Sequence, residues 1–427
     1  MKIRIAHGRL IDPANRVDTE QDLYIADGRV AAVGEAPDGF VADREIDARE
    51  LVVCPGLVDI AARLREPGFE YRATLESEME AAMAGGVTSL AIPPDTDPVL
   101  DEPGLVEMLR YRAKRLNRAH IYPVGALTVG LAGERLSEMA ELTDAGCVAF
   151  SQANVPMTDN KVLLHAMEYA ATFDFPVWLQ PMAPFLSRGG VAHDGEVASR
   201  LGLAGIPTAA ETIGLYTHIE LARLAGCRLH VTRLSSAEGL KMIKWARREG
   251  VDITCDVSIN QLHLCDMDIG YFNPHCRLIP PLRSQRDRDA LRRGLADGDI
   301  NALCSNHTPV DDDAKQCPFS EAEPGATGLE LLLPLTLKWA EQCSVPLLDA
   351  LARVTSDAAR IIGSQRGGHL SVDARADVCI FDPAGETLVA RETLRSQGKN
   401  TPFLGLCLPG RVRTTIVEGQ IMYGEPR

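Results

Sequence analysis

The chain has 427 residues, of which 45% are hydrophobic and 24% are charged, and its 44 basic and 59 acidic side chains give a net charge of −15. The high apolar content, without a long low-complexity tract, argues against an intrinsically disordered protein. An acidic chain repels phosphate backbones, so the charge also argues against nucleic-acid binding. The longest apolar stretch, residues 329–339, contains Glu330, Pro334 and Lys338 and therefore cannot span a membrane.

The eleven cysteines predict a reducing compartment. Their number is odd, no two have Cys-x-x-Cys spacing, and most lie in apolar segments such as the one around Cys147. This pattern is typical of reduced, buried thiols rather than of disulfides. At the amino end, Lys2 and Arg4 stand where a secretory signal would begin its apolar core. We therefore expect a cytoplasmic protein.

Both ends of the chain predict short strands. Apolar and polar residues alternate there, and Asp27-Gly28 is a typical hairpin-turn sequence. Neither end is long enough for a core of its own, so we predict one composite β domain built from both. Its predicted strands are 1–6, 22–26 and 29–33 near the amino end and 377–381, 411–417 and 420–423 near the carboxyl end.

Between the two ends, short apolar segments alternate with helical segments. Eight such alternations predict a parallel (β/α)₈ barrel, in which functional side chains lie at the carboxyl ends of the strands. The predicted strands are 57–60, 87–92, 121–127, 147–151, 176–179, 228–232, 252–256 and 302–305. The predicted helices are 73–84, 105–116, 134–144, 160–171, 212–224, 237–248 and 284–296.

These elements predict an α/β fold with three segments. We expect residues 54–364 to form a (β/α)₈ TIM barrel, and residues 1–53 and 365–427 together to form a composite β-sandwich domain.

Several short motifs occur in order along the chain, mostly at the predicted strand ends. They are PGLVDI and LREPG within 55–68, PDTDP at 94–98, AFS at 149–151, CDVS at 255–258, PPLR at 280–283, HTP at 307–309, PF and GATGLE within 318–330, and NTPF and GRV within 400–412. In this order they resemble the motifs of a dihydroorotase of the amidohydrolase superfamily, in register over nearly the whole chain. The resemblance implies the same barrel and composite β-sandwich.

A dihydroorotase opens or closes a cyclic amide at a zinc centre, where a metal-bound hydroxide attacks and an aspartate carries the proton. By this resemblance, every position of the metal centre is occupied here by another residue type. Arginine has no lone pair to offer a metal, and asparagine cannot accept a proton as the aspartate does. The vestigial metal positions are Ala61 and Arg63 after the first strand, Gln152 (or Ala153 in a register shifted by one), Gln180, Arg233, and Asn306 at the catalytic aspartate. We expect no metal and no other cofactor.

The resemblance also places three substrate-binding positions. Arg65 keeps the arginine that binds the substrate carboxylate, whereas Asp95 and Ile279 replace two asparagines. Asp95 would repel an anionic substrate, and Ile279 offers no side-chain hydrogen bond. The family's paired histidines correspond to Asn260 and Gln261.

The remaining candidate residues have simpler structural explanations. We expect His230 and His307 to be buried, hydrogen-bonded core residues and Cys304 to be a packing residue. Buried guanidinium groups require an anion, so we expect Arg63 and Arg233 to pair with carboxylates. The candidates are Asp59, Asp95 and Asp256, with Asp59 preferred; Arg65 is expected to form an ion pair at the barrel mouth, and the acidic residues 311–313 a solvated loop.

Two functions remain under consideration. The first is a non-catalytic dihydroorotase homologue that assembles with the catalytic chain of aspartate carbamoyltransferase for pyrimidine biosynthesis, as a hetero-dodecamer of six chains of each kind. Association of the chain with itself as a dimer is a further possibility. The second is a divergent, metal-free or single-metal cyclic amide hydrolase that uses His307 or Cys304.

Overall fold

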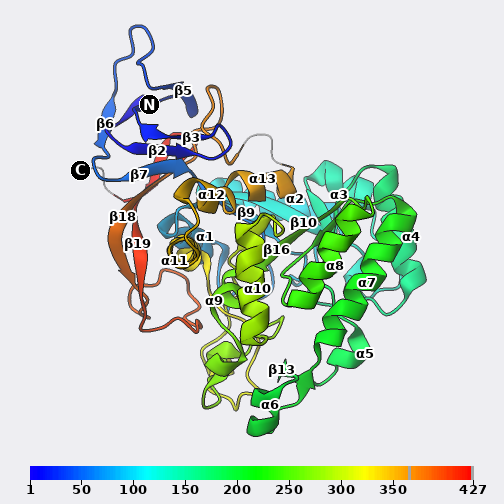
Figure 1. The fold of residues 1–427 in the computed structure, drawn as a ribbon. Helices are drawn as coiled ribbons and strands as arrows, with labels where there is room; N and C mark the ends of the chain where they lie inside the picture. Colours follow the sequence, from blue (N-terminus) through cyan, green and yellow to red (C-terminus); the bar gives the residue numbers. More distant parts are fainter. Residues whose placement is uncertain (364–366, 425–427) are drawn as a thin grey trace.

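The computed structural model describes residues 1–363 and 367–424. Eight parallel strands form a nearly closed barrel (Figure 1), and their order around the sheet is their order along the chain. The backbone N–H of Arg63 donates to the carbonyl oxygen of His307 at 2.9 Å, which joins the first strand end to the last. The predicted barrel is confirmed. Its strands are β8 (Leu57–Asp59), β9 (Val87–Ile92), β10 (His120–Ala126), β11 (Ala149–Ser151), β12 (Val177–Leu179), β15 (Leu229–Val231), β16 (Ile253–Ser258) and β17 (Ala302–Cys304).

Helices surround this barrel, and α4, α7, α8 and α10 form one outer wall in Figure 1. Some begin with side-chain caps that the sequence supplies locally: Thr74 and Ser77 form a capping box, and Ser236 caps the helix that follows it. The helices are α1 (Leu75–Ala84), α2 (Pro103–Leu116), α3 (Met139–Ala145), α4 (Asn160–Thr172), α5 (Pro184–Ser187), α6 (Glu196–Leu201), α7 (Thr208–Ala225), α8 (Ala237–Arg248), α9 (Ile259–His263), α10 (Gln285–Ala296), α11 (Leu332–Cys343), α12 (Leu347–Ala352) and α13 (Ser356–Ile362).

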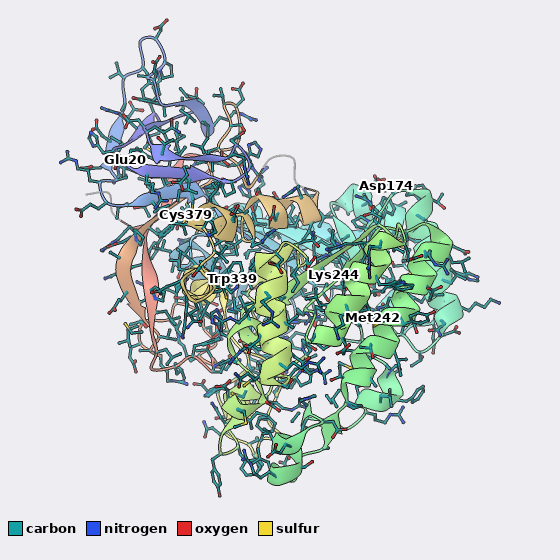
Figure 2. The ribbon with its side chains drawn as sticks, viewed as in Figure 1. Glu20, Asp174, Met242, Lys244, Trp339 and Cys379 are labelled. Atoms are coloured by element: carbon teal, nitrogen blue, oxygen red, sulfur yellow. The ribbon has the colours of Figure 1, made fainter. Side chains whose placement is uncertain are left out.

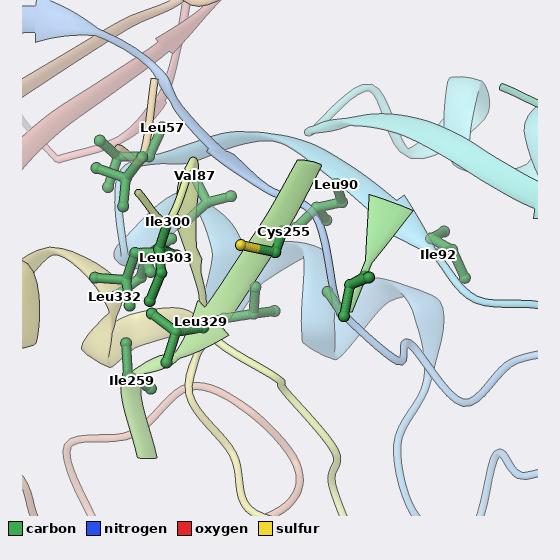
Figure 3. Packing of buried hydrophobic residues seen from close by; sticks show 14 of the residues in the cluster. Leu57, Val87, Leu90, Ile92, Cys255, Ile259, Ile300, Leu303, Leu329 and Leu332 are labelled. Atoms are coloured by element: carbon green, nitrogen blue, oxygen red, sulfur yellow. The ribbon is translucent and has the colours of Figure 1, made fainter. Parts of the chain in front are cut away.

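Apolar side chains from the strands and helices form one large core. Figure 3 shows part of it, where Leu57, Val87, Leu90 and Leu303 from three strands gather with Leu332 of α11. All five are fully buried. Burial of this apolar surface is the main contribution that stabilises the packing of the strands. This packing fixes where the carboxyl ends of the strands lie.

The two ends of the chain meet in a second, two-sheet domain. Strand β18 pairs with the amino-terminal β7 on one side and with β19 on the other, so the sheet is composite, as predicted. Apolar residues of both sheets, such as Ile3 and Ile416, share one buried cluster between the sheets. One sheet contains β5 (Arg29–Val33), β4 (Leu23–Ala26), β1 (Ile3–Ala6) and β6 (Arg44–Asp47); the other contains β20 (Gln420–Tyr423), β19 (Cys407–Val417), β18 (Val378–Leu388), β7 (Val52–Pro55), β2 (Arg9–Asp12) and β3 (Val17–Glu20).

Helix α11 connects the barrel to the composite domain. It packs against β19, and its fully buried Trp339 donates a hydrogen bond to the carbonyl oxygen of Arg292 in α10 at 3.3 Å. Figure 2 shows Trp339 inside the molecule, whereas the labelled Glu20 lies at its outer edge. The barrel and the composite domain are therefore in direct packing contact through α11.

Some predicted elements differ from the structure. The predicted helix 134–144 begins only at Met139, because residues before it are held by Thr128 and Ser137 in a turn that contains the left-handed glycines Gly130 and Gly133. Strands β2, β3, β6 and β7 were not predicted, and neither was the short pair β13 (Ala192–His193) and β14 (Gly205–Ile206). The predicted boundary between residues 364 and 365 lies outside the described residues. Within the described ranges, none of the helices has the length and apolar character needed to cross a membrane.

Candidate functional site

The carboxyl ends of the barrel strands bring most of the predicted site residues to one mouth of the barrel. Arg63 and Arg65 follow β8, Asp95 follows β9, Gln180 follows β12, Arg233 follows β15 and Asn306 follows β17. Parallel strands end at a common edge of a barrel, which is why side chains far apart in sequence meet there.

Arg63 is paired with a carboxylate, as the sequence predicted, and the partner is Asp95. The Nε of Arg63 donates to Asp95 Oδ2 at 2.8 Å, and Nη1 lies 3.4 Å from Thr308 Oγ1. Arg63 is only 5% exposed. Burial raises the pKa of the Asp95 carboxyl, but the adjacent charge and hydrogen bond of Arg63 outweigh it, so the pKa lies below its ordinary value.

Arg233 is held by neutral groups rather than by a carboxylate. Its Nη2 donates to Gln180 Oε1 at 3.0 Å and its Nη1 to Asn306 Oδ1 at 3.3 Å. Among the described residues no carboxylate forms an ion pair with this guanidinium; Asp256 instead accepts the backbone N–H of Arg233 at 3.0 Å. The prediction that Arg233 pairs with a carboxylate is therefore wrong. The amide of Asn306 donates onward to the carbonyl oxygen of Ile279 at 3.3 Å.

Arg65 does not form the predicted ion pair either. Its Nε donates to the carbonyl oxygen of Pro309 at 2.8 Å, and the residue is 7% exposed. Burial, followed by the repulsion of Arg63, lowers the pKa of both Arg65 and Arg233 to about 10. Both arginines remain charged at neutral pH.

Three of these residues have left-handed backbones. The φ angles are 65° at Arg65, 54° at Arg233 and 49° at Asn306. Such conformations are unfavourable for residues other than glycine, and they persist only where the surrounding structure enforces them. The barrel therefore holds these three side chains in defined directions.

Two predicted positions do not join this cluster. The side chain of Gln152 is turned to the loop after β10, where its Nε2 donates to the carbonyl oxygen of Leu131 and its Oε1 accepts from Thr128, at 2.9 and 3.0 Å. Ala61 has no polar side-chain atom; its backbone N–H donates to Asp59 Oδ1 at 3.2 Å.

His230 is a buried core residue, as predicted. Its Nε2 donates to Asp256 Oδ2 at 2.9 Å, and its ring lies against that of Trp178. The other oxygen of Asp256 accepts from the thiol of Cys304 at 3.1 Å. Burial, together with the nearby carboxylates, raises the pKa of this thiol well above its ordinary value, so Cys304 is a protonated packing residue rather than a thiolate.

His307 is also buried, and both of its ring nitrogens are occupied. Nδ1 accepts the backbone N–H of Gly328 at 3.1 Å, so the proton is assigned to Nε2, which donates to Glu78 Oε2 at 2.7 Å. The sequence analysis did not identify Glu78, because its partner lies 229 positions away in the chain.

Asn400 is a second residue whose role was missed, although its motif was noted. Its Nδ2 donates to the carbonyl oxygens of Thr308 and Gly325, each at 3.1 Å, and its Oδ1 accepts the N–H of Val310 at 3.0 Å. Asn400 thus holds the loop that carries Thr308 and Pro309 in place at the mouth. The NTPF motif was the signal that could have indicated it.

Comparisons with known proteins agree with this architecture. The profile of the dihydro-orotase-like family matches residues 50–239, and that of the amidohydrolase family matches residues 320–423. A dihydroorotase-like protein of Pseudomonas aeruginosa is 44% identical over 99% of this chain and 100% of its own length, and one of Pseudomonas putida is 43% identical with the same coverage. A dihydroorotase of Syntrophotalea carbinolica is 39% identical over 99% of both chains.

The chain belongs to the dihydroorotase-like family.

Solved structures of a hydantoinase and a dihydropyrimidinase share the fold. The L-hydantoinase (dihydropyrimidinase) of Arthrobacter aurescens superimposes with a TM-score of 0.89 at 25% identity, covering 100% of this chain and 96% of that chain. A dihydropyrimidinase of Brevibacillus agri gives a TM-score of 0.85 at 20% identity with the same coverage, which shows the fold alone.

The donor set of this dihydroorotase-like chain does not fit a zinc centre. Zinc is bound by imidazole, thiolate or carboxylate groups. In the described part of the chain no three His, Cys, Asp or Glu side chains are grouped to hold a metal ion. At the mouth, the carboxylate of Asp95 is engaged by Arg63, and Arg63 and Arg233 are cations without a lone pair.

The environment of Asp59 corrects another prediction. The fully buried carboxylate does not pair with Arg63 or Arg233; it accepts the backbone N–H of Ser305 at 3.0 Å and that of Ala61, and its Oδ2 accepts from the Ser305 hydroxyl. Burial raises the pKa of this carboxyl, although these hydrogen bonds oppose the shift. Asp59 therefore ties β8 to β17 at the seam of the barrel.

We expect Asp59→Asn to lower the free energy of unfolding by only about 1 kcal/mol, because the amide oxygen keeps both backbone hydrogen bonds. Because the pKa of Asp59 is raised, its protonated form stabilises the folded chain at low pH, and that stability is lost as the pH rises through the raised pKa. The stability of Asp59→Asn should not show this decrease with rising pH. Urea unfolding across pH measures both effects. A loss of roughly 3 kcal/mol or more, the size expected when a buried ion pair is broken, would contradict the assignment of Asp59 as a hydrogen-bonded residue without an ion pair.

Proposed function

We propose that this chain is a non-catalytic dihydroorotase homologue that serves as an assembly subunit of an aspartate carbamoyltransferase complex in pyrimidine biosynthesis. One observation carries the proposal: Arg63 and Arg233 occupy two positions where the family resemblance expects metal-ligating histidines. Both guanidinium groups are buried and already hydrogen-bonded to protein groups. Two fixed positive charges oppose a divalent cation, since unit charges ~4 Å apart repel by roughly 4 kcal/mol even at an effective dielectric constant of about 20.

The proton-transfer and substrate positions support the same conclusion. Asn306 stands where the resemblance expects the catalytic aspartate, and its amide is engaged by Arg233 and by the carbonyl oxygen of Ile279. Asp95 stands where the resemblance expects an asparagine and is engaged by Arg63, and the Nε of Arg65 is engaged by the carbonyl oxygen of Pro309. The base and part of the carboxylate-binding set of a dihydroorotase are therefore missing.

The hydrolase alternative would rely on His307 or Cys304. Both nitrogens of His307 are occupied, by Glu78 and by backbone N–H groups, and its side chain is fully buried. The thiol of Cys304 is protonated and donates a hydrogen bond to Asp256. These contacts favour structural roles for both residues and leave the alternative without a nucleophile or a base.

The proposed partner follows from the family resemblance. The relatives from Pseudomonas aeruginosa and Pseudomonas putida are named dihydroorotase-like proteins rather than dihydroorotases. A barrel without catalytic groups that keeps its folding motifs acts through its surface, and a trimeric transferase favours matched symmetry, with six copies of each chain. All eleven cysteines are free, which agrees with a cytoplasmic location.

We expect the protein, purified without chelator, to contain well under one equivalent of zinc and to show no turnover of dihydroorotate or carbamoyl aspartate. Loss of a general base alone typically lowers the rate by ~10²–10⁴-fold. Asn306→Asp should not restore activity, because the other ligands remain absent. Elemental analysis and an assay with a zinc-dependent dihydroorotase in parallel test this. Stoichiometric zinc, or turnover that persists in chelator and disappears in His307→Ala, would contradict the proposal.

Coexpression with the aspartate carbamoyltransferase catalytic chain tests the assembly role. We expect light scattering to show one large species with six chains of each kind, and we expect transferase activity to depend on this chain. The transferase chain expressed alone is the control. Two proteins that elute separately, with the transferase fully active alone, would refute the assembly role.

A further inference from the structure

Three side chains at the barrel mouth keep buried N–H groups that no atom of the described residues accepts. They are Nη2 of Arg63, Nε of Arg233 and Nε2 of Gln180, on residues that are 5%, 4% and 9% exposed. A buried donor without an acceptor is unfavourable by about 1–3 kcal/mol, and by more when the group is charged. Such groups are rare in native proteins unless a water or a ligand satisfies them.

These donors belong to one connected cluster. Arg233 donates to Gln180 at 3.0 Å and to Asn306 at 3.3 Å. The hydroxyl of Thr308 donates to the backbone carbonyl of Asn306 at 3.1 Å and lies 3.4 Å from Nη1 of Arg63, which connects Arg63 to the other two. Gln180 already uses its oxygen for Arg233, so only its N–H₂ group remains. The cluster therefore offers hydrogen-bond donors and no free acceptor among these three side chains.

The charges of the cluster do not balance. Four guanidinium groups, of Arg63, Arg65, Arg72 and Arg233, face three carboxylates, of Asp95, Asp256 and Glu323; Arg72 and Glu323 pair with each other, which leaves one positive charge without a counter-charge. Moreover, both oxygens of Asp256 already accept hydrogen bonds, from His230, Cys304 and the backbone N–H of Arg233. Water can accept the free hydrogen bonds, but only an anion also neutralises the charge.

We propose that the barrel mouth binds a small oxyanion, a carboxylate or phosphate group, between Arg63, Arg233 and Gln180. Guanidinium groups bind both kinds of oxyanion through paired, charge-assisted hydrogen bonds. The single excess positive charge matches a monoanion, so a carboxylate should bind more tightly than phosphate. The left-handed backbone of Arg233 fixes the direction of one of these donors.

The hydrogen-bond donors of this site are not those of Arg65, to which the family resemblance assigns carboxylate binding and whose Nε donates to Pro309. The site uses instead the residues that replace metal ligands. It does not depend on the assembly role, and either proposal can fail without the other.

Anion-dependent thermal unfolding of the full chain tests the site. We expect sodium formate to raise the melting temperature saturably at constant ionic strength, with sodium phosphate as the second arm and sodium chloride as the reference. In Arg233→Gln the midpoint concentration should rise at least tenfold, since charge-assisted hydrogen bonds contribute about 1.5–3 kcal/mol. Arg247→Gln is the matched control, because its guanidinium is satisfied by Ile253, Asp299 and Asn301 at the opposite end of the barrel.

A second variant supplies the anion within the chain. Gln180→Glu keeps the shape of the side chain and places a carboxylate beside Arg233. It should melt at a higher temperature than the wild type in chloride and lose the response to formate. This variant decides the question if Arg233→Gln does not fold.

A saturable response to phosphate only would assign the site to phosphate-bearing ligands and support the oxyanion proposal. The proposal is wrong if formate and phosphate do no more than chloride at equal ionic strength. It is also wrong if Gln180→Glu keeps the wild-type response.

Discussion

Replacing Glu78 by alanine should lower the free energy of unfolding by about 3–5 kcal/mol, the usual loss when one partner of a buried pair is removed. The fully buried carboxylate accepts from four donors, which are Nε2 of His307, the hydroxyls of Ser77 and Ser396, and the backbone N–H of Gln397. Through these bonds it joins α1, the end of β17 and the carboxyl-terminal segment. Urea denaturation followed by circular dichroism measures the loss.

Glu80→Ala in the same helix is the matched control. Its ion pair with Arg118 is solvent-exposed, so its removal should change stability by less than about 1 kcal/mol. Equal losses in the two variants would contradict the assignment of Glu78 as the joining residue.

The contribution of Glu78 should also depend on pH. Burial raises the pKa of this carboxyl, but the hydrogen bonds from His307, Ser396 and Gln397 outweigh it, so the pKa lies below its ordinary value of 4.5. A carboxyl with a lowered pKa stabilises the folded chain fully above its unfolded pKa, and the stability is lost as the pH falls through the folded pKa. The difference between wild type and Glu78→Ala should therefore be constant near neutrality and shrink below pH 4.5.

Removing the carboxylate of Asp95 should have the second largest effect. Asp95→Ala leaves Arg63 buried without its anion and increases the excess positive charge of the mouth. Because the Asp95 side chain is 24% exposed, we expect a loss of about 2–4 kcal/mol, somewhat less than for a fully buried pair. Thermal and urea unfolding at low salt measure it.

A double variant separates the pair from its surroundings. Replacing Arg63 by glutamine together with Asp95→Ala should recover part of the stability, since no buried guanidinium is then left without the carboxylate of Asp95. Asp18→Ala, which removes the exposed partner of Arg9, should lose less than about 1 kcal/mol. If Asp95→Ala lost no more stability than Asp18→Ala, this would contradict the buried ion pair, because Arg63 would then be stabilised by solvent.

The comparison of Asp59 with Asp95 shows what sequence reasoning could and could not decide about the site. Both were candidates to neutralise the buried arginines, and Asp59 was preferred. In the folded barrel, Asp59 lies at the seam between β8 and β17 and bonds to Ser305, whereas Asp95 follows β9 and reaches Arg63. The choice depended on the direction of each side chain at its strand end.

The sequence by itself determined the alternation of strands and helices, the joining of the two chain ends, and the residue types at the mouth. Each of these depends on local patterns, such as apolar periodicity, the Asp27-Gly28 turn and motif order, which a single segment carries within itself. The tertiary structure alone decided which charges meet. The pairing of Glu78 in α1 with His307, the neutral partners of Arg233, and the three donors left without acceptors all involve residues from different elements of the barrel. Their distances are set by the packing of the whole barrel, because hydrogen bonds and charge pairs act only over a few ångströms.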